Sequence, residues 1–138
     1  MSCHQDASSY VEKQRQMLVG IARDIWEHPQ VGFQETYASD LIAAALAEAG
    51  FRVCKPVAGM DTALVAEWGA GAPVIGILGE YDALPGLSQK VSEIRGPVEV
   101  GAPGHACGHN LLGVAALGAV LAARHEMMRQ GLPGTLRY

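Results

Sequence analysis

Two short clusters of chemically active side chains stand out in the sequence. The first holds two carboxylates, Glu80 and Asp82, and the second holds His105, Cys107 and His109. Imidazole nitrogen and thiolate sulfur are the ligands that borderline-soft divalent metals prefer. A nearby carboxylate either binds the ion itself or orients a histidine that does. Together, the two clusters indicate a metal site.

The second cluster reads His-Ala-Cys-Gly-His, so its three ligand-type residues alternate. In an extended segment, alternating side chains point to the same side, and two or three of them could meet one ion. Gly108 would let the backbone wrap closely. The alternatives are a set of ordinary polar loop residues with a buried cysteine, or a structural zinc site, which needs four protein ligands. For that second case, His28 and His125 are interpreted as capping or surface histidines, and Cys3 and Cys54 lack partner spacing.

Periodicity and turn residues predict the elements that must position these clusters. The first cluster directly follows a continuous apolar run, which is typical of a strand covered on both faces. A long Gly- and Pro-rich loop separates it from the second cluster, which precedes a helix that is apolar nearly all round. The expected elements are helices from Ser8 or Ser9 to Trp26, 36–49 and 110–130, and strands 51–54, 62–68, 73–78 and one starting at Thr135.

This order predicts an α/β fold, with helices on both faces of the sheet in three layers. The first two strands should form a hairpin, and the third and fourth a parallel crossover through the buried helix. Ligands in open α/β sheets gather beyond the carboxyl ends of strands, where both clusters would lie. Gly113 and Gly118 each cost the helix about 1 kcal/mol against alanine. We therefore expect close packing of that helix against the sheet.

Composition limits the function further. The 138 residues suit one domain or a piece of one, and the net charge is −4 with no strongly basic stretch. Nucleic acid and anionic membrane surfaces are therefore poor candidate partners. No apolar run reaches the roughly 20 residues of a membrane span, and the polar start argues against a secretory signal. Three scattered cysteines are no disulfide framework, so we expect a reduced, cytoplasmic chain.

Around the two clusters, the sequence resembles the metal-dependent aminoacylase and amidohydrolase type of metallopeptidase. Within that family it is most similar to the B-type subunit of the p-aminobenzoyl-glutamate hydrolases, which also carries a linker between the two motifs. The resemblance runs in the expected order over nearly the whole chain. Its matching stretches are WEHPQVGFQE (26–35), GILGEYDALPGLSQ (76–89), GHACGHNLLGVAALGA (104–119) and LPGTLRY (132–138).

The resemblance implies a site with two divalent metal ions, zinc or manganese. Matched by motif, Cys107 and His109 correspond to metal ligands. Asp82 corresponds to the catalytic-site aspartate that orients a ligand. Glu80 and His105 are additional candidates for ligation or substrate binding.

The resemblance also implies an activity, namely metal-assisted hydrolysis of an amide bond in N-acyl amino acids such as p-aminobenzoyl-glutamate, by the full-length parent. Residues 1–138 would be the N-terminal portion of the catalytic, metal-binding domain. The general-base glutamate would follow Tyr138, and the dimerisation or lid domain and the C-terminal catalytic part would be absent. Asn110 stands where many indole-acetyl-amino-acid hydrolases have an aspartate, which weakens transfer of their substrate preference.

The expected partners are a small N-acyl amino acid and, for the full-length protein, further copies or a second subunit in a homo- or hetero-oligomer. The fragment is expected to be inactive alone. Two alternatives remain open at this point. The parent could be another amidohydrolase or dipeptidase of the same family, or the chain could be a non-catalytic metal-binding or interaction fragment.

Overall fold

The computed structural model describes residues 3–138, and these residues form four helices and one four-stranded sheet. The predicted α/β class is confirmed. In chain order the elements are α1 (Cys3–Lys13), α2 (Arg15–Glu27), α3 (Thr36–Glu48), β1 (Arg52–Cys54), β2 (Val65–Ala70), β3 (Val74–Gly76), α4 (His109–Gln130) and β4 (Gly134–Arg137).

The sheet has the strand order β1-β2-β4-β3. β1 and β2 pair antiparallel, which confirms the predicted hairpin, and β3 and β4 pair parallel through α4, which confirms the predicted crossover. Sequence reasoning did not foresee that β4 would lie between β2 and β3 and pair antiparallel with β2. The last strand in chain order is therefore internal to the sheet.

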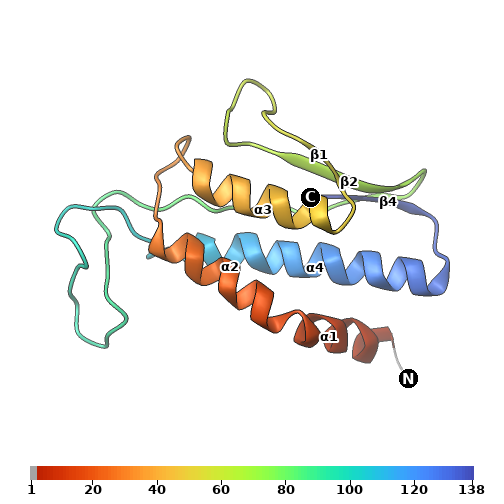
Figure 1. The fold of residues 1–138 in the computed structure, drawn as a ribbon, viewed down its shortest axis with the longest axis horizontal. Helices are drawn as coiled ribbons and strands as arrows, with labels where there is room; N and C mark the ends of the chain where they lie inside the picture. Colours follow the sequence, from red (N-terminus) through yellow and green to blue (C-terminus); the bar gives the residue numbers. More distant parts are fainter. Residues whose placement is uncertain (1–2) are drawn as a thin grey trace.

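The helices lie along one face of this sheet, with α3 and α4 next to the strands and α1 and α2 on the far side of α4 (Figure 1). Their contact with the sheet forms the core, whose most completely buried side chains are Ile25, Ile42, Leu46, Leu117, Val120 and Leu136. Within the described residues the helices therefore lie on one face of the sheet, in a fold of the predicted α/β class (Figure 1). On the other face, Glu67 of β2 pairs with the exposed guanidinium groups of Arg52 and Arg137.

β3 also differs from its prediction as a strand covered on both faces. Val74 is 54% exposed and Ile75 is 51% exposed. The physical reason is position, because β3 lies at the edge of the sheet and, within the described residues, has only β4 as a strand neighbour. An apolar run alone does not distinguish an edge strand from a central one.

The predicted first helix is instead two helices, α1 and α2, and it begins earlier than expected. The chain turns at Gln14, yet the Gln14 N–H donates to the Tyr10 carbonyl (3.1 Å) and the Leu18 N–H to the Gln14 carbonyl (3.0 Å). A tertiary contact supports the earlier start, since Asp6, which precedes the predicted start, pairs with Arg129 of α4 (3.1 Å). Tyr10 also stacks on His125 of α4, with ring centroids 4.4 Å apart. Met1, Ser2 and the side chain of Cys3 lie outside the described residues.

Helix α4 matches its prediction closely. It begins after Gly108 (φ 77°) and ends at Gly131 (φ 63°), both in the left-handed region that glycine tolerates. By length and composition it could cross a membrane, but half of its most apolar stretch is buried against the other elements, as in a core helix. The two internal glycines were predicted to pack against the sheet, but they approach other elements instead. Gly113 approaches the loop after β3, and Gly118 approaches Leu18 of α2.

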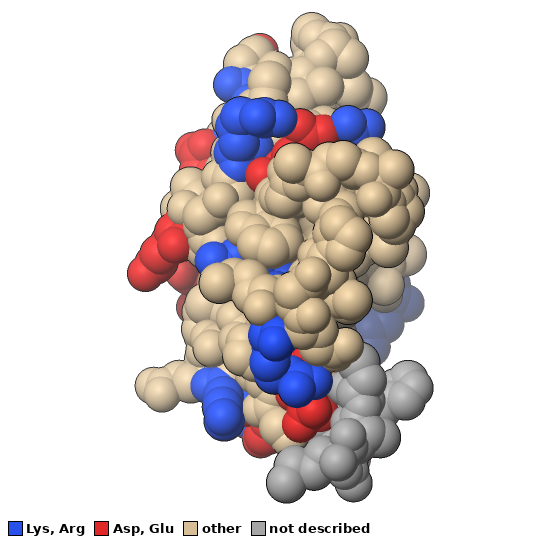
Figure 2. All heavy atoms as spheres, turned by 90° about the vertical axis from the view of Figure 1, so that its right-hand side faces the viewer, with Lys and Arg blue, Asp and Glu red and all other residues tan. Residues whose placement is uncertain are grey.

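Charged side chains are mixed on the face shown in Figure 2, where basic and acidic groups lie next to one another among uncharged residues. Ion pairs of this kind include Arg129 with Asp6 (3.1 Å) and Lys55 with Asp40 (2.5 Å).

Candidate metal centre

The fold brings the two predicted clusters together beyond the carboxyl end of β3. The strand ends at Gly76, and the Ile77 N–H still donates to the Arg137 carbonyl (2.8 Å), so the pairing with β4 continues one residue further. The chain then passes to Glu80 and Asp82, while α4 starts at His109. This is the location that the sequence predicted for both clusters.

His109 lies between the two carboxylates. Its Nδ1 is 2.6 Å from Oδ1 of Asp82, and its Nε2 is 3.1 Å from Oε2 of Glu80. An ionised carboxylate can only accept a hydrogen bond, so Nδ1–H is the donor toward Asp82. One ligand-type atom from each of the three residues lies within 4.8 Å of the others.

This arrangement fits a divalent metal ion. Two ligand atoms on a tetrahedral ion, each about 2.0–2.2 Å from it, lie about 3.3–3.6 Å from one another. The 3.1 Å separation of His109 Nε2 and Glu80 Oε2 is close to that spacing. Asp82 holds the other ring nitrogen, which is the usual way a carboxylate orients a metal-binding histidine. The geometry thus gives Glu80 a direct place in the site and Asp82 an orienting one.

The other two residues of the second cluster are not part of this group of three. The Gly108 N–H donates to the His105 carbonyl (3.0 Å), so the segment is a tight turn and not the extended chain that was predicted. Because of this turn, Cys107 and His105 do not join the group of three, although the Cys107 thiol is exposed next to it in sequence. The expected extended conformation is therefore wrong for this segment, and the argument from alternation does not apply to it.

His105 is an internal anchor in this structure. Its side chain is buried, and its Nε2 hydrogen bonds to the Ile25 carbonyl of α2 (3.2 Å). A carbonyl only accepts, so Nε2 carries the hydrogen and Nδ1 is a buried acceptor with no hydrogen-bond partner among the described residues. Burial lowers the pKa of this imidazole. Asn110 anchors α4 in the same way, donating from Nδ2 to the Ala22 carbonyl (3.1 Å).

Gly113 lets α4 approach the loop that carries the two carboxylates. A Cβ at this position would lie 2.6 Å from the carbonyl oxygen of Glu80. Gly113 is four residues after His109, so both face the same loop from one side of the helix. Only a residue without a side chain fits this contact, which keeps His109 close to Glu80 and Asp82.

A buried network that sequence reasoning missed supports the loop from the other side. Thr62 Oγ1 donates to Oε2 of the buried Glu35 (2.7 Å), and the hydroxyls of Tyr81 (2.5 Å) and Ser39 (2.7 Å) both donate to the Thr62 carbonyl. Tyr81 lies between Glu80 and Asp82 in sequence, and burial raises its pKa. These partners are 19 to 27 residues apart in the chain, so no local spacing could reveal them.

The segment after α2 also contacts the site loop directly. The Ala83 N–H donates to the Gln30 carbonyl (2.8 Å), and Val31 forms a parallel bridge with Ala83. This segment includes Phe33, which belongs to the first of the stretches that carry the family resemblance. Phe33 lines a cavity together with Glu80 and Asp82 of the candidate metal centre.

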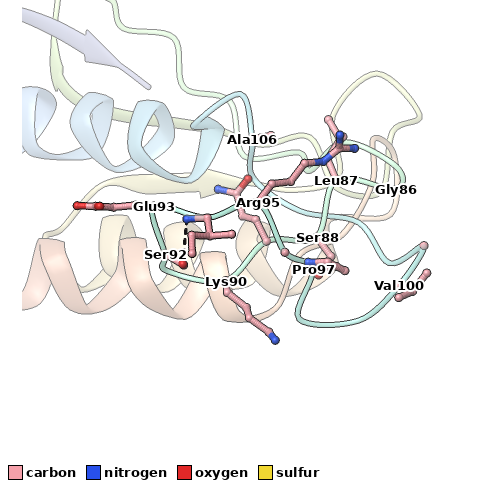
Figure 3. A pocket seen from close by; sticks show the side chains of 14 residues that line it. Gly86, Leu87, Ser88, Lys90, Ser92, Glu93, Arg95, Pro97, Val100 and Ala106 are labelled. Carbon is pink, nitrogen blue, oxygen red and sulfur yellow. Dashed lines mark hydrogen bonds between the residues drawn. The ribbon is translucent and has the colours of Figure 1, made fainter.

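Two cavities flank the centre. One, of about 310 Å³, is lined by Gly32, Phe33, Glu35, Met60, Thr62, Ala63, Gly79, Glu80, Tyr81 and Asp82. The other, of about 590 Å³, lies within residues 86–103, which we call the arm, and reaches Ala106. Figure 3 shows this arm cavity, with Arg95 extending toward Gly86 and Leu87 while Lys90 and Glu93 point outward.

The arm is joined to the site by a short antiparallel ladder. Leu84 and Gly104 exchange two backbone hydrogen bonds of 3.0 Å, and the Ser88 N–H donates to the Ala102 carbonyl (3.0 Å). A Cβ on Gly104 would lie 2.2 Å from the Leu87 carbonyl oxygen, so glycine is needed for this pairing. The predicted long loop thus begins after the cluster of Glu80 and Asp82 and ends before the cluster of His105, Cys107 and His109.

The chain is similar in sequence to known hydrolases. The chain is 44% identical over 130 residues to the B-type subunit of p-aminobenzoyl-glutamate hydrolase from Escherichia coli, covering 93% of this chain and 27% of that protein. It is 36% identical over 116 residues to an IAA-amino acid hydrolase of Arabidopsis thaliana, covering 83% of this chain and 26% of that protein. No protein-family model matches the sequence.

The fold is also similar to that of a solved structure. The chain superposes with a TM-score of 0.71 and 29% identity on a dinuclear metal-binding peptidase of the M20 family from Bacillus subtilis, covering 91% of this chain and 34% of that one. The chain therefore spans about a quarter to a third of the length of the proteins it matches.

Proposed function

Because this chain is homologous to M20 metallopeptidases and amidohydrolases, we propose that the protein of which it forms part hydrolyses the amide bond of an N-acyl amino acid. We take p-aminobenzoyl-glutamate as the substrate, following the 44% identity to a hydrolase named for it. The single observation that carries the proposal is the position of His109 between Asp82 and Glu80, which fits a metal centre beside a cavity.

The residues of this chain would hold and orient the centre. His109 and Glu80 would bind a divalent ion, Asp82 would fix the imidazole through Nδ1–H, and Cys107 would supply a further ligand after the turn that carries it has adjusted. Divalent ions bound here would polarise the amide carbonyl and favour deprotonation of the attacking water. Cleavage of the C–N bond then yields a carboxylate and the free amine of the amino acid.

Further parts of the proposal extend beyond the described residues. We propose two ions per site, either zinc or manganese, consistent with the dinuclear peptidase that the chain resembles. We propose that residues 1–138 belong to the N-terminal part of the catalytic domain and that a general-base glutamate follows them. The Escherichia coli relative is named as one subunit of its hydrolase, which supports a hetero-oligomer with a second subunit. A cytoplasmic location is proposed on the sequence pattern alone.

The test is hydrolysis of p-aminobenzoyl-glutamate by the complete gene product, followed as released p-aminobenzoate. Activity should be lost after removal of metal with a chelator and restored by zinc or manganese. The His109→Ala variant should lose activity by at least about 100-fold, because it removes a ligand and the group that Asp82 orients. Hydrolysis that resists both the chelator and this substitution would refute the metal mechanism.

A second substrate class is favoured by one observation. The chain also matches an IAA-amino acid hydrolase at 36% identity and an N-acetylcysteine deacetylase of Bacillus subtilis at 30% identity. The same centre could therefore serve a different N-acyl amino acid. A panel of N-acyl amino acids that differ only in the acyl group separates these possibilities.

A further inference from the structure

The smaller cavity shares its wall with the candidate metal centre. Glu80 and Asp82 line it on one side, and Phe33 and Met60 contribute large apolar side chains to the same lining. A group bound in this cavity would therefore lie next to His109 (2.6 Å from Asp82) and the bond to be cleaved. This closeness makes the cavity a candidate for the part of the substrate adjoining the amide.

Phe33 has an unusual backbone for its side chain. Its φ is 67°, within a turn closed by the Gln34 N–H donating to the Val31 carbonyl (2.9 Å). The third position of such a turn normally takes glycine when φ is positive, and a bulky residue there is strained. Here the adjacent Gly32 is not in that region, whereas the phenylalanine is. The strain places the ring on the surface, where Phe33 is 78% exposed.

The turn that carries Phe33 is fixed to the site loop. The Ala83 N–H donates to the Gln30 carbonyl (2.8 Å), and Ala83 directly follows Asp82. Backbone hydrogen bonds therefore hold the turn that carries Phe33 next to the loop of the metal centre. An exposed aromatic side chain that is strained and anchored in this way is suited to contact a ligand and not to fill a core.

The side chains that line the two cavities indicate which part of a substrate each one accepts. The charged residues that line it are the carboxylates Glu35, Glu80 and Asp82, and its lining includes no lysine or arginine among the described residues. Glu80 and Asp82 belong to the candidate metal centre, so bound ions would offset their charge. The large apolar side chains of the lining, Phe33 and Met60, suit an acyl group better than the charged amino-acid part of the substrate. The arm cavity reaches Ala106 beside Cys107, and Arg95 extends into it while Lys90 and Glu93 point outward (Figure 3), so it offers a cation to the amino-acid part.

We propose that the smaller cavity is the acyl subsite and that Phe33 is the specificity-determining residue that selects aromatic acyl groups by ring stacking. The inference rests on the proposed function and adds which end of the substrate each cavity takes. Offset or edge-to-face contact between Phe33 and an aryl group favours it over a small aliphatic acyl group. Met60 supplies the adaptable opposite contact.

The test compares two substrates on the complete, metal-loaded protein, N-benzoyl-glutamate and N-acetyl-glutamate. Phe33→Ala should lower kcat/KM for the benzoyl substrate by about 10- to 100-fold and change it for the acetyl substrate by less than about 3-fold. Phe33→Gly, which relieves the positive φ while removing the ring, should give the same selectivity change and shows that strain is not the cause. Met128→Ala, at an exposed apolar position far along α4, is the matched control and should change neither.

A binding measurement separates this inference from the proposed function. Calorimetry with p-aminobenzoate should show at least about 10-fold weaker binding to Phe33→Ala than to the wild type, whereas acetate binding should not differ. Equal loss for both substrates, or unchanged p-aminobenzoate binding, overturns the role of Phe33 and leaves amide hydrolysis intact. Absence of hydrolysis by the wild type overturns the proposed function, while the binding result still decides whether Phe33 contacts an aryl group.

Discussion

Replacing Gly113 with alanine should loosen the candidate metal centre while leaving α4 folded. The added Cβ would lie 2.6 Å from the carbonyl oxygen of Glu80, whereas ordinary contact begins at 3.4 Å. The obstructing atom belongs to the backbone, so it cannot rotate away. Helix α4 and the loop after β3 must therefore separate by about 0.8 Å, the difference between those two distances.

This separation of α4 from the loop should weaken metal binding. If the loop carries Asp82 with it, the 2.6 Å contact from Asp82 to His109 lengthens toward about 3.4 Å, beyond a normal hydrogen bond. Loss of such an orienting contact costs about 10- to 100-fold in metal affinity. Stability should change less, because overpacking costs about 1–3 kcal/mol and the exchange of glycine for alanine in a helix returns about 1 kcal/mol.

The assay is zinc binding by calorimetry, together with denaturant unfolding of the metal-free protein. Gly20→Ala is the matched control, since it makes the same exchange in α2 with nothing within 4 Å of the new Cβ. The control should bind zinc like the wild type and gain up to about 1 kcal/mol of stability. If Gly113→Ala also binds zinc like the wild type and is stabilised by the same amount, the reasoning from close approach is wrong.

Three further substitutions follow from the structure. Asp82→Asn keeps the shape but weakens the acceptor for His109, so zinc affinity should fall by about 10-fold or more in calorimetry, with little change in the melting temperature. Thr62→Val removes the hydroxyl that donates to a buried carboxylate, and denaturant unfolding should show a loss of about 1.5–3 kcal/mol; a loss below about 0.5 kcal/mol would count against the network. Hydrogen bonds from Arg129 lower the pKa of Glu126, so this pair should stabilise the fold above the ordinary carboxyl pKa and lose its effect as the pH falls below about 4.5. Urea unfolding at pH 7 and pH 3 should therefore show that the free energy of unfolding changes less with pH in Glu126→Gln than in the wild type. The same change in both proteins would mean that this pair does not contribute to the pH dependence.

Local patterns predicted the elements well where a single period or a terminating residue decides the structure. Helix α3 was expected from Thr36, and α4 was expected to end before Gly131, because glycine and the preceding apolar spacing mark those limits. The α1–α2 boundary at Gln14 was missed, since that residue carries no helix-breaking signal. Stacking of Tyr10 on α4 instead sets how this part of the chain packs.

The candidate site was predictable in its members but not in its geometry. Residue types indicated Glu80, Asp82 and His109, and the structure brings these three together. Alternation suggested that two or three of His105, Cys107 and His109 could meet one ion, but the segment forms a turn and is not extended. A period-two argument holds only for extended chain, and a glycine able to adopt a positive φ was the signal against it.

The internal position of β4 has a consequence for the order in which the protein folds. β3 has no strand neighbour among the described residues until β4 docks beside it, and the closing hydrogen bonds join Ala66 to Tyr138 at 2.8 and 3.0 Å. Contacts so distant in sequence form slowly, because a long stretch of chain must first be confined. During synthesis, Glu80 and His109 are therefore made before β4, the strand that must pair with β3. We therefore expect the metal centre to form late in folding, after the sheet has closed.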